Sequence, residues 1–362
     1  MPRQSRNLDL SPRENFNSPF FLTAASLRIL CRVTDHRHLE GSAMSTALSR
    51  RGFIAASAAT LALPAAIKAQ EAKPAAPATA PFRFCLNTST IRECSYQGKK
   101  VDILAGIEVA SKAGYSGIEP WINELDRYVK EGGSLKDLRK RIADAGLKVE
   151  SAIGFAAFLH ENDEERKKGL EEAKRCMGLV HEIGGERLAA PPVGVTDKTG
   201  LDLFKLADRY HALCEVSKTE GILPQLELWG FSKTLSRLGE VAFVGIEAAH
   251  PQACFLLDIY HIYKGGSDFE GLAMFAGGRM HNFHVNDYPG EPARATINDA
   301  QRVYPGDGIA PLDKIFRTLR DVGYRGVLSL ELFNRDYWKQ DAFEVAKTGL
   351  EKTRAAVAKA LA

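Results

Sequence analysis

The chain contains 362 residues, of which 45% are hydrophobic and 26% are charged. This balance matches soluble globular proteins and excludes a collagen, a mostly disordered chain and a multi-pass membrane protein. The formal net charge of +3 is unevenly spread, because residues 1–70 hold nine basic and four acidic residues, whereas the rest of the chain holds 39 basic and 41 acidic residues. The body of the chain therefore gives no electrostatic reason to expect a nucleic-acid partner.

The first 80 residues are expected to form a disordered or signal segment that precedes the fold. The motif Ser-Arg-Arg-Gly-Phe-Ile at 49–54 comes before a short apolar run, and this order resembles a twin-arginine export signal. We predict a signal peptide over 44–70, a Pro/Ala linker over 71–80 and, over 1–43, an extension ahead of the true translation start. The expected location is periplasmic or otherwise exported, with the twin-arginine export machinery as a partner. The run is too short to span a bilayer, so no stable membrane insertion of the mature protein is expected.

From residue 81 onward, apolar runs of strand length alternate with amphipathic stretches. The apolar runs are almost continuous, as is typical of parallel strands buried on both faces, and the stretches between them repeat at about 3.6 residues. In chain order, the predicted strands are Phe82–Asn87, Gly117–Trp121, Lys148–Gly154, Arg187–Pro191, Leu223–Trp229, Ala253–Asp258, Met280–Val285 and Gly326–Phe333. The predicted helices, one after each strand in the same order, are Ile103–Ala113, Leu135–Ala145, Asp163–Ile183, Leu201–Glu220, Lys233–Ala248, Phe269–Phe275, Leu312–Val322 and Asp341–Leu361.

Eight such units predict an α/β protein with a single (β/α)8 TIM barrel over residues 81–362. An open, doubly wound sheet is the alternative arrangement of the same elements. Such a sheet usually carries a glycine-rich phosphate-binding turn after its first strand. Here the first strand runs into Cys-Leu-Asn-Thr-Ser-Thr, which contains no glycine, so the barrel is favoured.

Ionisable side chains lie at the ends of four consecutive predicted strands. They are Glu227, Asp258, His284 and Glu331, on the fifth to the eighth strand respectively. Because the C-terminal ends of barrel strands meet at one face, we expect these side chains to lie together. Burying three carboxylates side by side is costly without a cation, so we predict that all four residues bind one divalent metal. Oxygen-rich donors favour Mn²⁺, with Mg²⁺, Co²⁺ and Zn²⁺ as alternatives.

These motifs resemble the xylose isomerase-like TIM barrel superfamily, which includes sugar isomerases, sugar epimerases and inosose dehydratases. The resemblance covers about residues 82–362. The residues that carry it are Gly-Tyr-Ser-Gly-Ile-Glu at 114–119, Leu-Glu-Leu-Trp around Glu227, Leu-Leu-Asp-Ile-Tyr-His at 256–261, Asn-Phe-His-Val-Asn-Asp at 282–287, Arg-Val-Tyr-Pro-Gly-Asp-Gly at 302–308 and Leu-Glu-Leu-Phe around Glu331.

The resemblance implies roles for individual residues. Glu227 and Glu331 would bind the metal and also move protons, and Asp258 and His284 would complete the ligand set. His261 would contact a substrate oxygen, and Arg302 would hold a substrate hydroxyl or carbonyl group. Aromatic residues near the strand ends, Trp229 and Trp121, are candidates to stack on the face of a sugar. One position departs from the pattern: Lys233 stands where ketose epimerases carry a second glutamate, which argues against a simple ketose epimerase.

The predicted function is that of a divalent-metal-dependent isomerase or epimerase that acts on a sugar or keto-sugar by proton abstraction through an enediolate. A lyase is the first alternative, of the inosose dehydratase type or eliminating from a keto-glycoside at the same metal site. A non-catalytic exported sugar-binding protein is the second alternative. A metal-dependent nuclease is the third, which the net charge of the body disfavours. The residues leave open the identity of the sugar and whether the protein forms a homo-oligomer.

Overall fold

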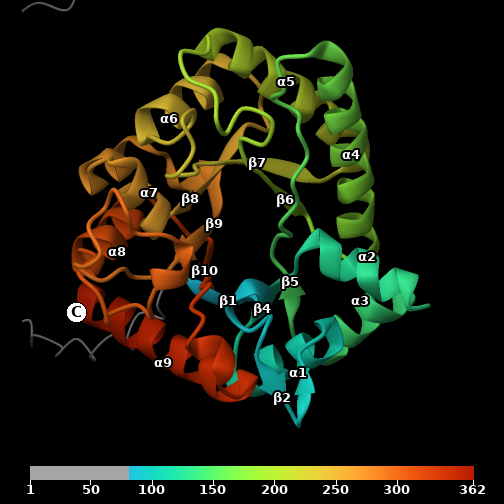
Figure 1. Ribbon diagram of the computed structural model, residues 1–362, viewed down its shortest axis with the longest axis vertical. Helices are drawn as coiled ribbons and strands as arrows, with labels where there is room; N and C mark the ends of the chain where they lie inside the picture. Colours follow the sequence, from blue (N-terminus) through green and yellow to red (C-terminus); the bar gives the residue numbers. More distant parts are fainter. Residues whose placement is uncertain (1–80) are drawn as a thin grey trace, which may run out of the picture. The chain divides into compact units, whose positions relative to one another are not determined.

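Parallel strands form the centre of the molecule, and the helices surround them (Figure 1). The computed structural model describes residues 81–362; the predicted extension, signal peptide and linker lie outside the described residues. The strands of the central sheet are β1 (Arg83–Asn87), β4 (Gly117–Glu119), β5 (Lys148–Val149), β6 (Arg187–Ala190), β7 (Leu223–Glu227), β8 (Cys254–Asp258), β9 (Met280–Val285) and β10 (Val327–Leu330).

Every pairing in this sheet is parallel. Neighbouring strands follow the order β5-β4-β1-β10-β9-β8-β7-β6. A parallel bridge between Ala152 and Leu188 joins the segment after β5 to β6, at the other end of that order. The sheet therefore closes on itself, and the predicted TIM barrel is confirmed.

The α-helices within residues 81–362 are α1 (Ile103–Ala113), α2 (Ile122–Lys130), α3 (Leu135–Asp144), α4 (Asp163–Glu182), α5 (Leu203–Glu220), α6 (Leu238–Glu247), α7 (Ile259–Gly265), α8 (Leu312–Asp321) and α9 (Ala342–Leu361). Helix α1 has the predicted bounds, because both of its ends carry strong signals. The Asp102 side chain accepts a hydrogen bond from the Ala105 N–H at its start, and Gly114 ends it with a φ of 91°, which suits glycine.

Two helical predictions need correction, and two observed helices were not predicted. Helix α6 begins at Leu238 rather than Lys233, because the Lys233 N–H donates to the Thr196 carbonyl and ties this segment to the loop after β6. The predicted helix Phe269–Phe275 is a 3-10 helix, Phe269–Met274. Helices α2 and α7 were not predicted, because one or two turns directly after a strand give too short a period to detect.

Each predicted strand is present in the barrel, but several strands are shorter than expected. The largest difference is β5, predicted over Lys148–Gly154 and observed over Lys148–Val149. Beyond it, Ala152 and Ile153 make only isolated bridges. A short hairpin, β2 (Ser95–Tyr96) with β3 (Lys99–Lys100), was not predicted and lies outside the barrel sheet.

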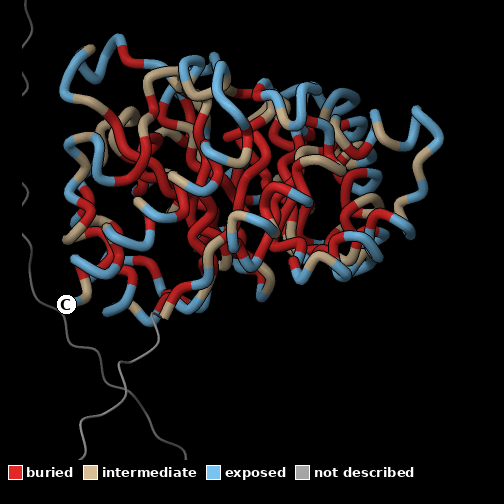
Figure 2. The backbone as a smooth tube through the Cα atoms, turned by 90° about the horizontal axis from the view of Figure 1, so that it is seen from below, coloured by how far each residue is buried: buried red, intermediate tan, exposed pale blue. Residues whose placement is uncertain are grey.

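The apolar core lies mainly between the strands and the helices, as the buried inner path of the chain in Figure 2 indicates. Inside the barrel, the apolar cluster is small and consists of Ile153, Ala189 and Leu256, with Trp121 packed against it. Buried polar side chains fill much of the rest of the interior, among them Glu119, Gln225, Asn282 and Ser329. The fold thus places a polar centre inside an apolar shell.

Asp287 anchors the loop that follows β9 and that carries Arg302. Its carboxylate accepts hydrogen bonds from the backbone N–H groups of Gly306, Gly308 and Ala310 at 2.9–3.1 Å. A β-bridge between Asp287 and Val303 adds a second tie. Asp287 therefore holds the loop through both its side chain and its backbone.

We expect Asp287→Ala to lower the free energy of unfolding by about 3 kcal/mol or more, because several backbone donors would lose a charged acceptor at once. Urea unfolding monitored by circular dichroism measures the change. Asp307→Ala, which removes a half-exposed partner of Lys352 in the same loop, should change stability by less than about 1 kcal/mol. Equal effects of the two substitutions would contradict the anchoring role of Asp287.

Candidate metal centre

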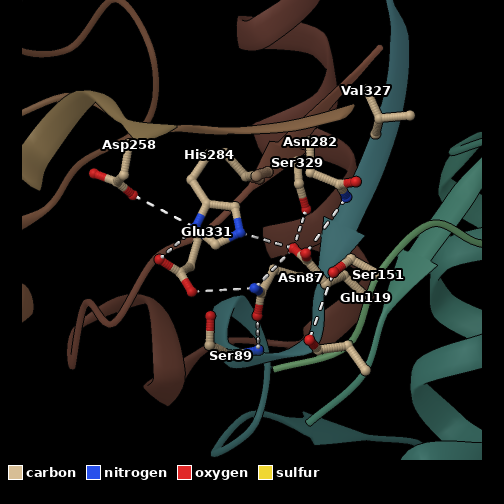
Figure 3. Close-up of polar contacts among 12 residues, drawn as sticks. Asn87, Ser89, Glu119, Ser151, Asp258, Asn282, His284, Val327, Ser329 and Glu331 are labelled. Carbon is tan, nitrogen blue, oxygen red and sulfur yellow. Dashed lines mark hydrogen bonds and ion pairs between the residues drawn. The ribbon is translucent and has the colours of Figure 1, made fainter. Parts of the chain in front are cut away.

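Three of the four predicted ligands converge at the C-terminal ends of their strands. Asp258 ends β8, His284 lies in β9, and Glu331 directly follows β10. One ligand atom from each lies within 4.8 Å of the other two. His284 Nδ1 is 3.3 Å from Glu331 Oε2 and 3.8 Å from Asp258 Oδ2 (Figure 3). All three side chains are buried, so the structure brings together donors suited to a cation.

Glu227, the fourth predicted ligand, lies outside this triplet but lines a cavity together with Glu331. It ends β7 and is only 3% exposed. Its Oε2 atom is buried and has no hydrogen-bond partner among the described residues. Burial raises the pKa of this carboxyl to about 8. Glu227 therefore offers a free donor atom next to the triplet.

The charges of the site are balanced by protons and by one arginine. Burial alone would lower the pKa of His284, but the carboxylates of Glu331 and Glu119 raise it well above its ordinary value. Arg302 Nη1 lies 3.0 Å from Asp258 Oδ2 and 2.8 Å from Glu331 Oε2. Two of the predicted metal ligands, the Glu227 carboxyl and the His284 ring, thus favour their protonated forms. This behaviour is expected of a carboxylate-rich site without a cation.

The residues present fit a divalent metal. Three carboxylates and one imidazole are ligands that Mn²⁺, Co²⁺ and Zn²⁺ all accept. Within residues 81–362, Glu227 Oε2 is buried without a hydrogen-bond partner, and His284 Nδ1, 3.3 Å from Glu331 Oε2, makes no hydrogen bond of standard geometry. Buried polar atoms normally have one, so an ion that binds both atoms would satisfy them.

His261 and Arg302, the predicted substrate-binding residues, contact each other beside the triplet. Arg302 Nη2 donates to His261 Nε2 at 3.1 Å and also pairs with Asp299. Because an arginine can only donate, Nε2 of His261 is the acceptor and its proton is on Nδ1. Burial and the charge of Arg302 lower the pKa of His261, which favours this neutral form. His261 Nδ1 is buried without a partner among residues 81–362, so it is a free donor.

Aromatic side chains surround a cavity of about 220 Å³ above the triplet. The ring centroids run from Phe333 to Trp121 at 5.9 Å, on to Phe155 at 5.3 Å, to Trp229 at 5.9 Å and to Phe231 at 5.0 Å. His261 contacts Phe231 and Arg302, and Arg302 in turn contacts Phe333, so these residues form a closed ring around the cavity. We call these five aromatic residues the aromatic collar. Phe155 and Phe231 form its outer edge, 44% and 46% exposed.

Of the predicted aromatic contacts, both Trp229 and Trp121 line this cavity, whereas Phe155, Phe231 and Phe333 were not predicted. Lys233, which replaces the second glutamate of ketose epimerases, is exposed and is not among the residues that line the cavity.

The sequence interpretation also missed three polar residues that surround the triplet. Asn286 donates to Asp258 Oδ2 at 2.9 Å. Asn87 donates to Glu331 Oε1 at 3.1 Å. Glu119 lies 3.0 Å from His284 Nε2. Each follows or ends a barrel strand, so the rule that found the four predicted ligands would have found these as well.

The barrel and its carboxylate-rich face define a TIM-barrel enzyme, and comparison with known proteins identifies the family. A family model described as "Xylose isomerase-like TIM barrel" matches residues 107–356. The chain belongs to this family, and it is an enzyme of this superfamily, since its curated relatives are named isomerases, epimerases and dehydratases.

Two relatives and one solved structure illustrate the range of similarity. The inosose isomerase of Bacillus velezensis is 26% identical over 282 residues, which cover 77% of this chain and 98% of that protein. The 3-dehydroshikimate dehydratase of Pseudomonas aeruginosa is 27% identical over 244 residues, which cover 67% of this chain and 37% of that protein. A 1.8 Å crystal structure of the "IOLI protein with a binding zinc atom" matches with a TM-score of 0.69 and 23% identity, over 77% of this chain and 99% of that one.

Within residues 81–362, no helix has both the length and the apolar character required to cross a bilayer.

Proposed function

We propose that the protein is a divalent-metal-dependent isomerase or epimerase of a cyclic keto-sugar or a related polyol-derived ketone. The observation that carries this proposal is the convergence of Asp258, His284 and Glu331 beside the unpartnered Oε2 atom of Glu227. The names of the relatives support the substrate class, because inosose isomerase acts on a cyclic polyhydroxy ketone.

Asp258, His284, Glu331 and Glu227 would hold the metal. When bound, a divalent cation would polarise the substrate carbonyl and so acidify the neighbouring C–H group. The zinc atom in the IolI structure supports a divalent ion. We propose Mn²⁺ from the oxygen-rich donor set, with Zn²⁺ as the alternative that this relative favours.

Glu227 and Glu331 are the residues proposed to move protons. They extend from β7 and β10, which are separated by two other strands, so they approach a substrate in the cavity from different directions. The carboxylate that removes the C–H proton becomes the acid of the next step. Return of a proton from the other carboxyl would invert the carbon centre, which is an epimerisation. Return by the same carboxyl to the adjacent carbon, together with transfer of the hydroxyl proton to the former carbonyl oxygen, would be an isomerisation.

Two residues are proposed to bind the oxygens of the substrate. The Nδ1–H group of His261 is buried and has no partner among the described residues, and the His261 side chain lines the cavity. It would donate a hydrogen bond to a substrate hydroxyl or carbonyl. Arg302, only 1% exposed, would stabilise negative charge that develops on the substrate oxygens.

The cavity favours a small, unphosphorylated ring. Its volume of about 220 Å³ is below the range of roughly 300–1,000 Å³ typical of drug-sized ligands. Arg302 is the only Lys or Arg among the described residues that line it, and its guanidinium is already bound to Asp258, Glu331 and Asp299. That lining thus holds no second cation that could neutralise a phosphate, and the aromatic collar suits the apolar face of a sugar ring.

We expect Trp229→Ala to raise KM for the substrate about tenfold with little change in kcat, because stacking on this ring contributes binding rather than chemistry. Steady-state kinetics on the first active substrate measure both constants. Phe204→Ala is the matched control, since Phe204 is exposed and pairs with Phe243 away from the cavity. A loss confined to kcat would contradict the stacking role.

Dehydration at the same site is the second candidate function. Two of the relatives are named 3-dehydroshikimate dehydratase. The same proton abstraction would then expel a hydroxyl group from the next carbon, with the protonated carboxyl as its acid. The predicted export by the twin-arginine route also remains a proposal, which rests on the motif at 49–54.

The proposal is tested by incubating Mn²⁺-loaded protein in D₂O with free ketoses, inososes and keto-glycosides, followed by NMR. Deuterium beside the carbonyl together with a new stereoisomer or a shifted carbonyl would support an isomerase or epimerase. Loss of a hydroxyl or an aglycone would identify a lyase instead. No exchange with any compound, in protein that retains metal and binds sugar, would support the non-catalytic binding protein.

A further inference from the structure

The carboxyl group of Glu119 lies behind His284, on the side of the ring away from Asp258 and Glu331 (Figure 3). Its Oε2 atom is 3.0 Å from His284 Nε2, and both side chains are fully buried. The other ring nitrogen, Nδ1, is the one that faces the triplet. Glu119 and the proposed metal position therefore contact opposite nitrogens of one imidazole.

Three further donors hold the Glu119 carboxyl in place. Ser329 donates to Oε2 at 2.7 Å, Asn87 donates to the same atom at 3.0 Å, and Asn282 donates to Oε1 at 3.4 Å. These residues come from β10, β1 and β9, so three strands fix the position of one carboxyl. Asn87 also donates to Glu331 Oε1, and it thereby links Glu119 to a second member of the triplet.

A neutral imidazole carries its proton on one nitrogen and offers a lone pair on the other. Because a carboxylate accepts hydrogen bonds, Glu119 favours the tautomer with the proton on Nε2. That tautomer leaves the Nδ1 lone pair aimed at Asp258 and Glu331. A carboxylate behind the ring also increases the electron density that the ligand nitrogen can donate to a metal.

We propose that Glu119 is a positioning residue of the metal centre, which fixes the tautomer and the orientation of His284 so that Nδ1 binds the ion. This inference rests on the proposed metal centre and assigns a role to a residue outside the ligand set. Glu119 is not among the described residues that line the substrate cavity. Its effect on catalysis is therefore expected to pass through the metal.

The test compares metal affinity in the wild type and in Glu119→Gln, by competition titration with a chromophoric chelator. The amide has the size of the carboxyl but lacks its charge and presents a donor as well as an acceptor. We expect Zn²⁺ and Co²⁺ to bind about 10- to 100-fold more weakly, and the visible spectrum of bound Co²⁺ to change. In zinc-loaded wild type, ¹⁵N NMR of the His284 ring should show the proton on Nε2.

Glu150→Gln is the matched control. Glu150 is another fully buried carboxyl of the barrel interior, but it pairs with Arg83 near the start of β1. Its substitution should leave the Co²⁺ spectrum and the metal affinity unchanged. If Glu119→Gln fails to fold, Ser329→Ala removes one hydrogen bond to the same oxygen and should weaken metal binding a few-fold.

The outcomes separate this inference from the proposed function. Wild-type protein that binds no metal would overturn both. Wild-type protein that binds metal, with unchanged affinity and an unchanged Co²⁺ spectrum in Glu119→Gln, would overturn the role of Glu119 alone. A proton on Nδ1 in the zinc-loaded wild type would do the same.

Discussion

Glu331→Gln is expected to lower the exchange of the substrate C–H proton with solvent by at least about 10³-fold, because it removes a proton-transfer group. The same change removes one member of the Asp258–His284–Glu331 triplet. The charges of His284 and Arg302 hold the pKa of Glu331 well below its usual range despite its burial. The wild-type residue is therefore an ionised carboxylate that is ready to bind a cation or to accept a proton.

The measurement is deuterium incorporation by NMR at saturating metal, so that weaker metal binding does not by itself abolish the signal. Glu150→Gln serves again as the control, since it neutralises a buried carboxyl remote from the cavity. That control should exchange at the wild-type rate. Exchange in Glu331→Gln within tenfold of the wild type would remove Glu331 from the proposed proton transfer.

Metal affinity is expected to fall steeply as the pH is lowered. The Glu227 carboxyl has a pKa raised to about 8 by burial, and the carboxylates around His284 raise the pKa of its ring well above the ordinary value. The Glu227 carboxyl is therefore largely protonated below pH 8 in the metal-free protein, the His284 ring favours its protonated form, and both must lose a proton to become ligands. Because up to two protons are displaced, affinity should decrease by up to about a hundredfold for each pH unit below 8.

Isothermal titration in buffers of different ionisation enthalpy measures the number of protons released. Glu227→Gln tests the assignment, since it removes one of the two titrating groups and should reduce the pH dependence to about tenfold per unit. A wild-type affinity that does not change between pH 6 and 8 would show that neither Glu227 nor His284 binds the metal.

Periodicity in the sequence was sufficient to predict the barrel, because each βα unit is a local pattern. The alternation of apolar strands and amphipathic stretches predicted every strand of the closed sheet, and it gave the observed bounds of α1, which Asp102 and Gly114 cap in the structure. Where tertiary contacts decide, prediction failed. The start of α6 depends on the hydrogen bond from Lys233 to Thr196, two residues in different loops, and no local pattern records that contact.

In the candidate site as well, the residues at strand ends could be predicted, whereas contacts between distant segments could not. Glu227, Asp258, His284 and Glu331 were found because each ends its own strand, and barrel geometry requires strand ends to meet. Glu119 also ends its strand, so the same rule could have found it as a candidate, but its contact with His284 joins residues 165 positions apart and is not visible in the sequence.

The aromatic collar could not be assembled from the sequence either. Phe155, Phe231 and Phe333 lie after β5, β7 and β10, outside the strands themselves. Their meeting at the cavity depends on the paths of the intervening loops, which carry no periodic signal.

The central claim is that one divalent cation binds to Asp258, His284, Glu331 and Glu227. Anomalous X-ray diffraction from crystals of the metal-loaded protein, collected at the absorption edge of the metal, tests it most directly. We predict one strong peak within about 2.0–2.3 Å of His284 Nδ1 and of a carboxylate oxygen from each acidic residue. The absence of a peak at these side chains in crystals grown with excess metal, or a peak bound elsewhere on the chain, would contradict the account.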